Sequence, residues 1–182
     1  LMDEAKAKVK EILRERAGLS AEEVDEIAEK VAVGAIKYAL VSVDPIKPVV
    51  FSWDRVLNLE ANSGPFIQYA YTRASSILRK TRAKPSQPDY TLLQETQEKN
   101  LTVKLSMFPE VFIEASDSLK PEMMIEYSSD LADRFNAFYN HLPVLKAERR
   151  SLRDARLQLV KASKIVMENA LGVVGINMPG RM

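Results

Sequence analysis

Apolar residues recur every three or four positions between Met124 and Leu142, which is the spacing of one face of an α-helix. The spacings are 3, 4, 4, 3 and 4, and the members are Met124, Tyr127, Leu131, Phe135, Phe138 and Leu142. Such a regular seam is typical of a core helix. No convincing stretch alternates apolar and polar residues as a half-buried strand would, and the chain contains only six glycines. The pattern predicts an all-α protein folded as an antiparallel helical bundle.

Capping and turn residues divide the chain into a series of predicted helices. Ser20 followed by Glu23 forms a capping box that starts a helix over residues 21–43. Prolines predict an extended connector over residues 44–53 and a loop over residues 84–88. The other helices are expected over residues 53–59, from Pro65 to that loop, in two pieces between residues 92 and 115, from Pro121 to Pro143, and over residues 151–171, where Gly172 would supply the left-handed ending residue.

The composition removes most common catalytic chemistry. The chain has no cysteine, which excludes disulfides, thiolate nucleophiles and Cys-based zinc sites, and its single histidine, His141, cannot form a multi-histidine metal site. We expect no cofactor or metal in this chain. No run of 18 apolar residues occurs and the N-terminus is charged from its third residue, so we expect neither a membrane span nor a secretory signal. The expected location is the cytoplasm.

Charge is unevenly distributed although the net charge is only +1. Residues 1–30 contain nine acids and six bases. Residues 73–84 contain five bases and no acid, and residues 146–164 contain seven bases and two acids. Two local basic patches on a neutral protein fit either solvated helix surfaces or an anionic partner.

The predicted helix after Pro65 has two distinct faces. Ile67, Ala70, Ala74 and Ile77 recur at helical spacing and should turn inward. A neighbouring edge carries an aromatic ring, two cations and a hydroxyl, from Tyr69, Arg73, Ser76 and Lys80. A helix that only packs into a core does not need such an edge.

Two classes of function remain open on these residues alone. One is a helical RNA-binding module that uses the basic and aromatic edges. The other is a helical scaffold whose exposed tyrosines and methionines bind another protein without binding RNA. An independent enzyme fits less well, because the acids are scattered at helical spacing instead of converging on one site.

A series of motifs resembles the C-terminal anticodon-binding domain of arginyl-tRNA synthetases, the all-helical DALR domain. The similarity covers residues 31–182. The ending, with a Gly-Ile pair, a proline and a final Arg-Met, is especially similar to this family. In chain order the motifs are VAVGAIKYAL from Val31, NSGPFIQYAYTRASSILRK from Asn62, FPEV from Phe108, LADRFNAFY from Leu131, DARLQL from Asp154 and LGVVGINMPGRM from Leu171.

The resemblance implies a tRNA-recognition role within a larger class I arginine–tRNA ligase. Residues 1–30 would form a helical connection to a catalytic domain outside this sequence, and residues 31–182 the anticodon-binding domain. The nucleotide-binding and lysine-rich signatures of a class I active site do not occur here, so we expect no catalytic residue in this chain and no activity from it alone. ATP and Mg²⁺ would serve the catalytic domain. The implied partners are arginine-accepting tRNAs and that catalytic domain, with the enzyme a monomer.

The resemblance also implies RNA-contacting residues in two groups. The first would hold the anticodon nucleotides: the loop residues Asn62, Ser63 and Gly64, a stacking Tyr69, and Tyr139 and Met182 closing the pocket from the other side. The second would hold the stem-loop through cations and a hydroxyl: Arg73, Ser76, Arg79, Lys80, Arg82, Arg149, Arg150 and Arg153.

Two further residues are expected to be structural. Arg156 lies close in helical phase to the buried stripe of its predicted helix and should pair with an acid. His141 should cap the end of the helix that closes at Pro143.

Overall fold

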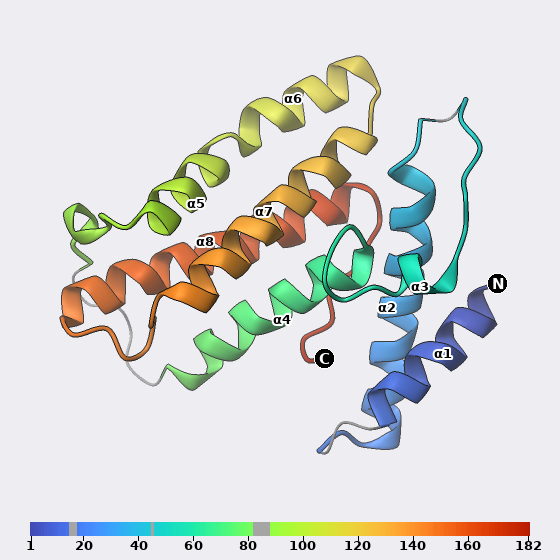
Figure 1. Ribbon diagram of the computed structural model, residues 1–182, viewed down its shortest axis with the longest axis horizontal. Coiled ribbons are helices and arrows are strands. Elements are labelled where there is room, and N and C mark those ends of the chain that lie inside the picture. Colours follow the sequence, from blue (N-terminus) through green and yellow to red (C-terminus); the bar gives the residue numbers. More distant parts are fainter. Residues whose placement is uncertain (15–17, 45, 82–87) are drawn as a thin grey trace.

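The computed structural model describes residues 1–14, 18–44, 46–81 and 88–182. All regular structure in these residues is helical (Figure 1), which confirms the all-α prediction. Most of the expected loop over residues 84–88 lies outside the described residues, and so does Arg82. The helices are α1 (Met2–Arg14), α2 (Ala21–Val41), α3 (Trp53–Val56), α4 (Gly64–Lys80), the short 3-10 helix η1 (Tyr90–Leu92), α5 (Thr96–Ser106), α6 (Phe108–Ser118), α7 (Glu122–His141) and α8 (Arg150–Val173).

Helices α4, α5, α7 and α8 form the bundle, and α6 lies on α7. Helix α8 runs antiparallel to both α4 and α7 (Figure 1). The predicted seam of α7 is confirmed: Leu131, Phe135 and Phe138 are fully buried, and Leu142 packs on the edge of the core. Burying each such side chain contributes about 1.5 to 3 kcal/mol, so the seam is a major source of stability.

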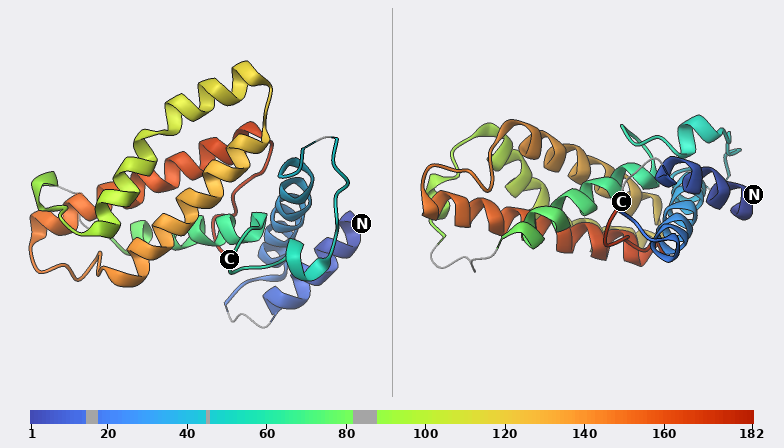
Figure 2. Two further views of the ribbon diagram at one scale, coloured as in Figure 1. Left: turned by 45° about the horizontal axis from the view of Figure 1, so that its top comes forward. Right: turned by 90° about the horizontal axis from the view of Figure 1, so that it is seen from below.

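Helices α1 and α2 pack together at one end of the bundle (Figure 2). Ala5, Val9 and Leu13 of α1 are buried at spacings of four against a row of small aliphatic side chains on α2, which makes a second apolar cluster. Lys6 forms ion pairs of 3.0 Å with both Asp25 and Glu29 across the pair of helices. Helix α2 is continuous through residue 30, and the domain boundary expected there remains a prediction.

Helices α2 and α4 approach so closely that their backbones touch. A β-carbon on Gly64, at the start of α4, would lie 2.4 Å from the carbonyl oxygen of Gly34 in the middle of α2. Only glycine at position 64 leaves room for this crossing. Farther along α2, the hydroxyls of Tyr38 and Ser129 lie 3.0 Å apart and join α2 to α7.

The helix ends agree with the sequence in most places. The capping box is confirmed, since the backbone N–H of Ser20 donates to the Glu23 carboxylate at 2.8 Å and the Ser20 hydroxyl accepts from the Glu23 N–H. The connector after α2 contains no strand among its described residues. Helix α3 is shorter than expected and ends at Val56.

The prediction that Gly172 ends the last helix is wrong. Gly172 stays within α8, and Gly175 has the left-handed backbone, with φ of 70°. The N–H groups of Ile176 and Gly175 donate to the carbonyls of Leu171 and Gly172, at 2.9 and 3.0 Å. This pair of bonds is the Schellman ending, in which glycine takes the position after the cap. No helix in the described part of the chain is long and apolar enough to cross a membrane.

Candidate nucleic-acid interface

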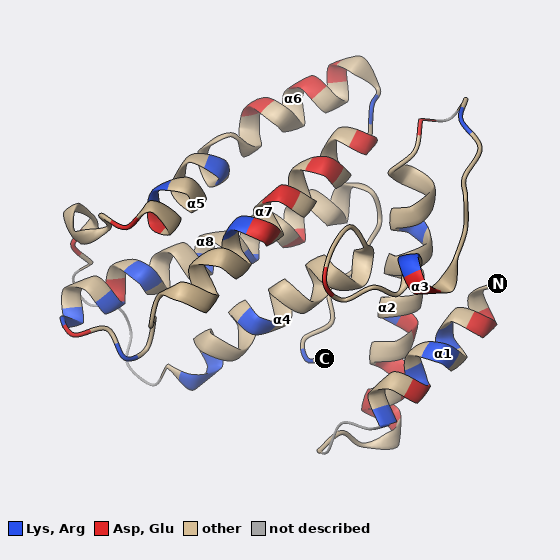
Figure 3. Ribbon diagram, in the orientation of Figure 1, with Lys and Arg blue, Asp and Glu red and all other residues tan. Residues whose placement is uncertain are grey.

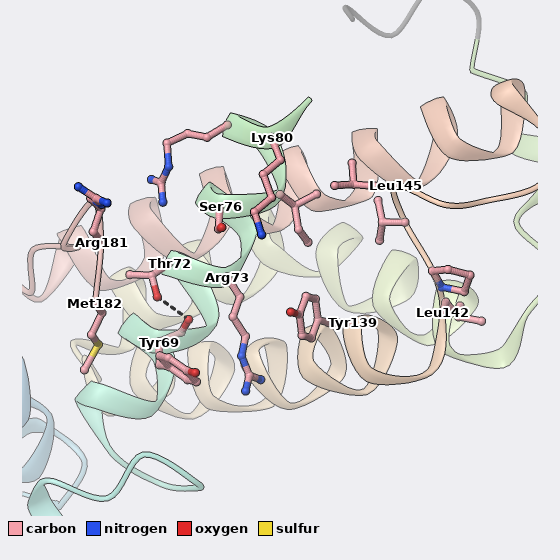
Figure 4. A pocket seen from close by; sticks show the side chains of 14 residues that line it. Tyr69, Thr72, Arg73, Ser76, Lys80, Tyr139, Leu142, Leu145, Arg181 and Met182 are labelled. Carbon is pink, nitrogen blue, oxygen red and sulfur yellow. Dashed lines mark hydrogen bonds between the residues drawn. The ribbon is translucent and has the colours of Figure 1, made fainter. Parts of the chain in front are cut away.

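The outward edge of α4 lines a hollow of about 470 Å³ (Figure 4). The end of α7, the turn that follows it and residues 181–182 form its other walls. The lining residues are Tyr69, Thr72, Arg73, Ser76, Ile77, Arg79, Lys80, Tyr139, Leu142, Pro143, Val144, Leu145, Arg181 and Met182. Seven of the residues expected from the sequence to contact RNA therefore lie around one cavity: Tyr69, Arg73, Ser76, Arg79, Lys80, Tyr139 and Met182.

Arg73 lies between two tyrosine rings in this hollow (Figure 4). Its guanidinium carbon is 4.4 Å from the centre of the Tyr69 ring and 5.2 Å from that of Tyr139. Its Nη1 donates a 2.8 Å hydrogen bond to Oδ1 of Asn136 on α7. The cation and the two aromatic faces are thus held together by contacts from two helices.

Helical phase explains how the sequence builds this edge. Ser63 caps α4, its hydroxyl accepting from the N–H of Phe66 at 3.0 Å, and so sets where the helix begins. The inward stripe of α4 is buried as predicted, which turns the Tyr69 and Arg73 edge toward α7. Tyr139 lies one residue beyond the buried seam of α7, is 40% exposed, and stacks at 6.4 Å on Phe135.

Helix α4 gives the hollow a positive rim. It contains three cations and no acidic residue, whereas α6 and α7 contain most of the acids of the bundle (Figure 3). Lys80 is exposed, and none of the described residues pairs with it. Arg79 is also exposed, but its Nη1 donates to the carbonyl of Gly180 at 2.7 Å and so holds the C-terminal segment against α4.

Residues 175–182 are fixed along α2 and α4 by polar contacts. Lys37 donates to the carbonyl of Gly175 at 2.6 Å, and Gln68 to that of Asn177 at 2.8 Å. Arg181 pairs with Glu23 of α2 at 3.2 Å. Met182 reaches the apolar cluster of α1 and α2 and also lines the hollow. This segment therefore forms a wall of the site.

The loop before α4 lies differently from the expectation. Ser63 is fully buried, with its hydroxyl bonded to the carbonyl of Asn58, and Gly64 is buried at the helix crossing. Both residues serve the fold, and neither presents surface to a ligand in this conformation. Asn62 is exposed, with φ of 50°, but it lines a small pocket of about 20 Å³ at the end of α2 and lies outside the hollow.

The predicted cations at the start of α8 also lie outside the hollow. Arg149 and Arg150 are exposed, and Arg153 pairs with the buried Asp154 at 3.0 Å.

The two structural predictions are confirmed. Arg156 is buried in a 2.7 Å ion pair with Glu98, and Nδ1 of the His141 ring lies 2.8 Å from the carbonyl of Ala137 in the last turn of α7.

Sequence reasoning missed Asn136, Arg181 and the turn of residues 142–145. Asn136 stands in the motif FNAFY three residues before Tyr139, a helical spacing that places both on one side of α7. Arg181 stands beside Met182 in the final motif. The turn is held by Arg156, whose Nη1 donates to the carbonyl of Pro143 at 3.0 Å. That contact depends on packing and has no local sequence signal.

The arrangement can bind anions and stack planar rings. Aromatic faces next to cations suit unpaired nucleotides, whose bases stack while their phosphates are neutralised. The described residues include no group of three His, Cys, Asp or Glu side chains able to hold a metal.

Comparison with known proteins gives one consistent result. A family model described as the DALR anticodon binding domain matches residues 67–182. The chain is 47% identical over its whole length to the arginine–tRNA ligase of Korarchaeum cryptofilum (strain OPF8), and it covers 28% of that protein. It is 44% identical over its whole length to that of Pyrococcus abyssi (strain GE5 / Orsay), covering 30%. The chain thus spans under a third of the length of these relatives.

Solved structures show the same fold. The Thermus thermophilus arginyl-tRNA synthetase superimposes on all of this chain with a TM-score of 0.92 at 32% identity, over 31% of its own length. The Plasmodium falciparum arginyl-tRNA synthetase gives a TM-score of 0.84 at 26% identity, again over all of this chain and over 33% of its own. The resemblance expected from the motifs is confirmed.

Proposed function

Because the chain belongs to the DALR anticodon-binding domain family, we propose that it binds the anticodon stem-loop of arginine-accepting tRNA. The observation that carries the proposal is the hollow beside α4, where Tyr69, Arg73 and Tyr139 lie together next to the exposed Lys80. No specific observation favours the protein-scaffold alternative, and we do not propose it.

In this proposal the aromatic and cationic groups divide the work. A base of the anticodon loop stacks on the exposed ring of Tyr139, which contributes about 1 to 3 kcal/mol per base. Lys80, and Arg149 and Arg150 farther along the surface, neutralise phosphates and give affinity that falls with salt. Met182 and the turn of residues 142–145 bound the space for a base.

The larger enzyme is the second part of the proposal. The whole protein would be an arginine–tRNA ligase, in which a separate catalytic domain uses ATP and Mg²⁺, and this domain fixes where the tRNA lies relative to that catalytic domain. Residues 1–30 would connect the two. We propose a monomeric, cytoplasmic enzyme, since its substrate tRNA is used there. The chain alone would form no arginyl-tRNA.

Fluorescence anisotropy of a labelled arginine-tRNA anticodon stem-loop tests the proposal. We expect binding that weakens with salt, and weaker binding of a loop with a scrambled anticodon. Tyr139→Ala should raise the Kd by about 5- to 150-fold, the loss of one stacked base. Tyr90→Ala removes an exposed tyrosine on η1 outside the hollow and is the matched control, with an expected change below about twofold.

Three outcomes would overturn parts of the proposal. No binding at low salt would remove the RNA role. Equal affinity for the cognate and scrambled loops would reduce the surface to a charged clamp that does not read the anticodon. Equal losses for Tyr139→Ala and Tyr90→Ala would show that the hollow is not where the base binds.

A further inference from the structure

The arginine side chains differ in the groups that they bind. Arg134, Arg153, Arg156 and Arg181 each pair with a carboxylate, which offsets their charge. Arg73 is bonded instead to the neutral amide oxygen of Asn136, at 2.8 Å. An amide acceptor fixes the guanidinium in one orientation but leaves its full positive charge unneutralised.

Orientation matters for Arg73 because its neighbours are aromatic faces. An arginine side chain loses rotamer entropy when it is fixed, so a single ring contact at a solvent-accessible site does not hold it well. Here Tyr69 lies on one side, Tyr139 on the other, and the hydrogen bond to Asn136 locks the plane between them. The result is a rigid, flat, charged group in the wall of the hollow.

Asparagine has a low helix propensity, so it is intrinsically unfavourable at position 136. Asn136 lies in the interior of α7, where asparagine is less favourable than alanine because its side chain competes with the backbone for hydrogen bonds. In the structure its Oδ1 bonds to another helix, and it lies one turn from Tyr139 on the same side of α7. A single residue thus aligns the cation of α4 with the exposed tyrosine of α7.

We propose that Asn136 is a positioning residue: by fixing Arg73 between the two tyrosine rings, it holds Tyr139 in place as the surface on which a base stacks, so that Arg73 serves base discrimination more than phosphate affinity. The inference rests on the proposed function and deepens it. It assigns two roles of Arg73, planar support for the tyrosine rings and point charge, to different measurable quantities: the ratio of Kd for scrambled and cognate loops, and the salt dependence of Kd.

Two substitutions at position 136 separate orientation from charge. Asn136→Leu has a similar size but no acceptor, so Arg73 loses its lock and keeps its charge. The ratio of Kd for the scrambled loop to Kd for the cognate loop should fall by about five- to tenfold, because one hydrogen bond is lost. The salt dependence of Kd should not change. Asn136→Asp keeps the acceptor and adds a neutralising charge. Discrimination should be retained, while the slope of log K against log salt should drop by up to about 0.7, one phosphate contact.

The same two substitutions at Asn100 are the matched controls. Asn100 is exposed on α5 and lies outside the hollow. Asn100→Leu and Asn100→Asp should leave both the discrimination ratio and the slope within error. Asn136→Ala supplies a second acceptor-free variant without added bulk, should Asn136→Leu disturb the packing.

A measurement without RNA keeps the inference separate from the proposed function. The NMR signal of the Arg73 Nε–H group should be sharp in the unmodified chain and in Asn136→Asp, and exchange-broadened in Asn136→Leu and Asn136→Ala. Unchanged spectra would mean that Asn136 does not hold Arg73 in place. If the spectra show that Arg73 is held but the chain binds no stem-loop, the proposed function would be wrong instead.

Binding measurements distinguish the positioning role of Asn136 from a phosphate-binding role of Arg73. Equal losses of cognate and scrambled affinity in Asn136→Leu, with a flatter salt dependence, would mean that Arg73 binds a phosphate and would refute the positioning role in base stacking. No change in any variant at position 136 would remove Asn136 from the site. Discrimination lost in Asn136→Leu and kept in Asn136→Asp is the result that supports the proposal.

Discussion

The bundle and the α1–α2 pair bury their apolar side chains in different ways. The bundle core is large and rich in aromatic residues, including Tyr71, Tyr127, Phe135 and Phe138. Among the described residues, the buried members of the α1–α2 cluster are alanine, valine, leucine and isoleucine. The bundle contains a buried ion pair between Glu98 and Arg156, whereas the ion pairs of Lys6 between α1 and α2 are partly solvated.

The difference indicates a division of roles. The bundle positions the hollow, because its walls come mainly from α4, α7 and the turn that Arg156 holds. The contact between α1 and α2 buries fewer of the described apolar residues than the bundle core does, and its charges are partly solvated. The two helices should therefore separate more easily and respond more to salt and pH. The single tryptophan, Trp53, packs on the α1–α2 cluster and can report on that contact.

The largest effect should come from the buried ion pair of the bundle. Glu98 is fully buried, and Glu98→Ala leaves the Arg156 guanidinium without its carboxylate, at a cost of about 3 to 5 kcal/mol. The midpoint of urea unfolding followed by circular dichroism measures this cost. Glu114→Ala, on the exposed face of α6, is the control and should change stability by less than about 0.5 kcal/mol. A loss below about 1 kcal/mol for Glu98→Ala would contradict a structural role for the pair.

The same substitution in each region should then give different kinds of loss. Leu131 and Leu13 are both buried, with exposed fractions of 0% and 1%. Leu131→Ala should destabilise the bundle by about 2 to 5 kcal/mol, seen by circular dichroism and Trp53 fluorescence together. Leu13→Ala should shift the fluorescence transition to lower urea while the main circular dichroism transition stays in place. Coincident shifts by both probes in Leu13→Ala would mean that the two regions unfold as one unit.

The smallest effect should be on the α1–α2 contact at acid pH. Hydrogen bonds from Lys10 and Lys6 hold the pKa of the Asp25 carboxyl below its ordinary value of about 3.9. Because the pKa is lower when α1 is docked, Asp25 stabilises docking above about pH 4 and loses this effect as pH falls through the docked pKa.

Trp53 fluorescence between pH 6 and pH 2.5 should therefore change at the acid end of that range. Asp25→Asn should reduce the acid-side change, and Glu122→Gln, at the start of α7, should not. An identical acid transition in the unmodified chain and Asp25→Asn would exclude this carboxylate as the cause.

Periodicity predicted much of the fold because helices are local. The α7 seam, the inward stripe of α4 and the Ser20 capping box all depend on residues within a few turns of one another, and all are confirmed. The Gly172 ending failed because two glycines near one helix end look alike in sequence. Only the φ of 70° at Gly175, next to Lys37 of another helix, separates them.

The site was harder to predict because its walls come from distant segments. Helical phase put Tyr69, Arg73 and Lys80 on one edge, as the structure has them. The polarity of the loop before α4 suggested an exposed Ser63, but the fold buries it under a contact between Gly64 and a residue 30 positions earlier. The bond from Arg73 to Asn136 likewise joins residues 63 positions apart, beyond the reach of any local pattern.

The crossing of Gly34 and Gly64 has a mechanical consequence. Where Gly64 meets the backbone of Gly34, no side chain lies between the two backbones to absorb a movement, so this contact acts as a rigid pivot. Helix α4 has 17 residues and extends about 25 Å from that point. A rotation of α4 by about 5° about the crossing would therefore displace Lys80 by about 2 Å, which is on the scale of a hydrogen-bond length. The backbone contact at one end of the helix therefore limits how far the charged group at the other end can move.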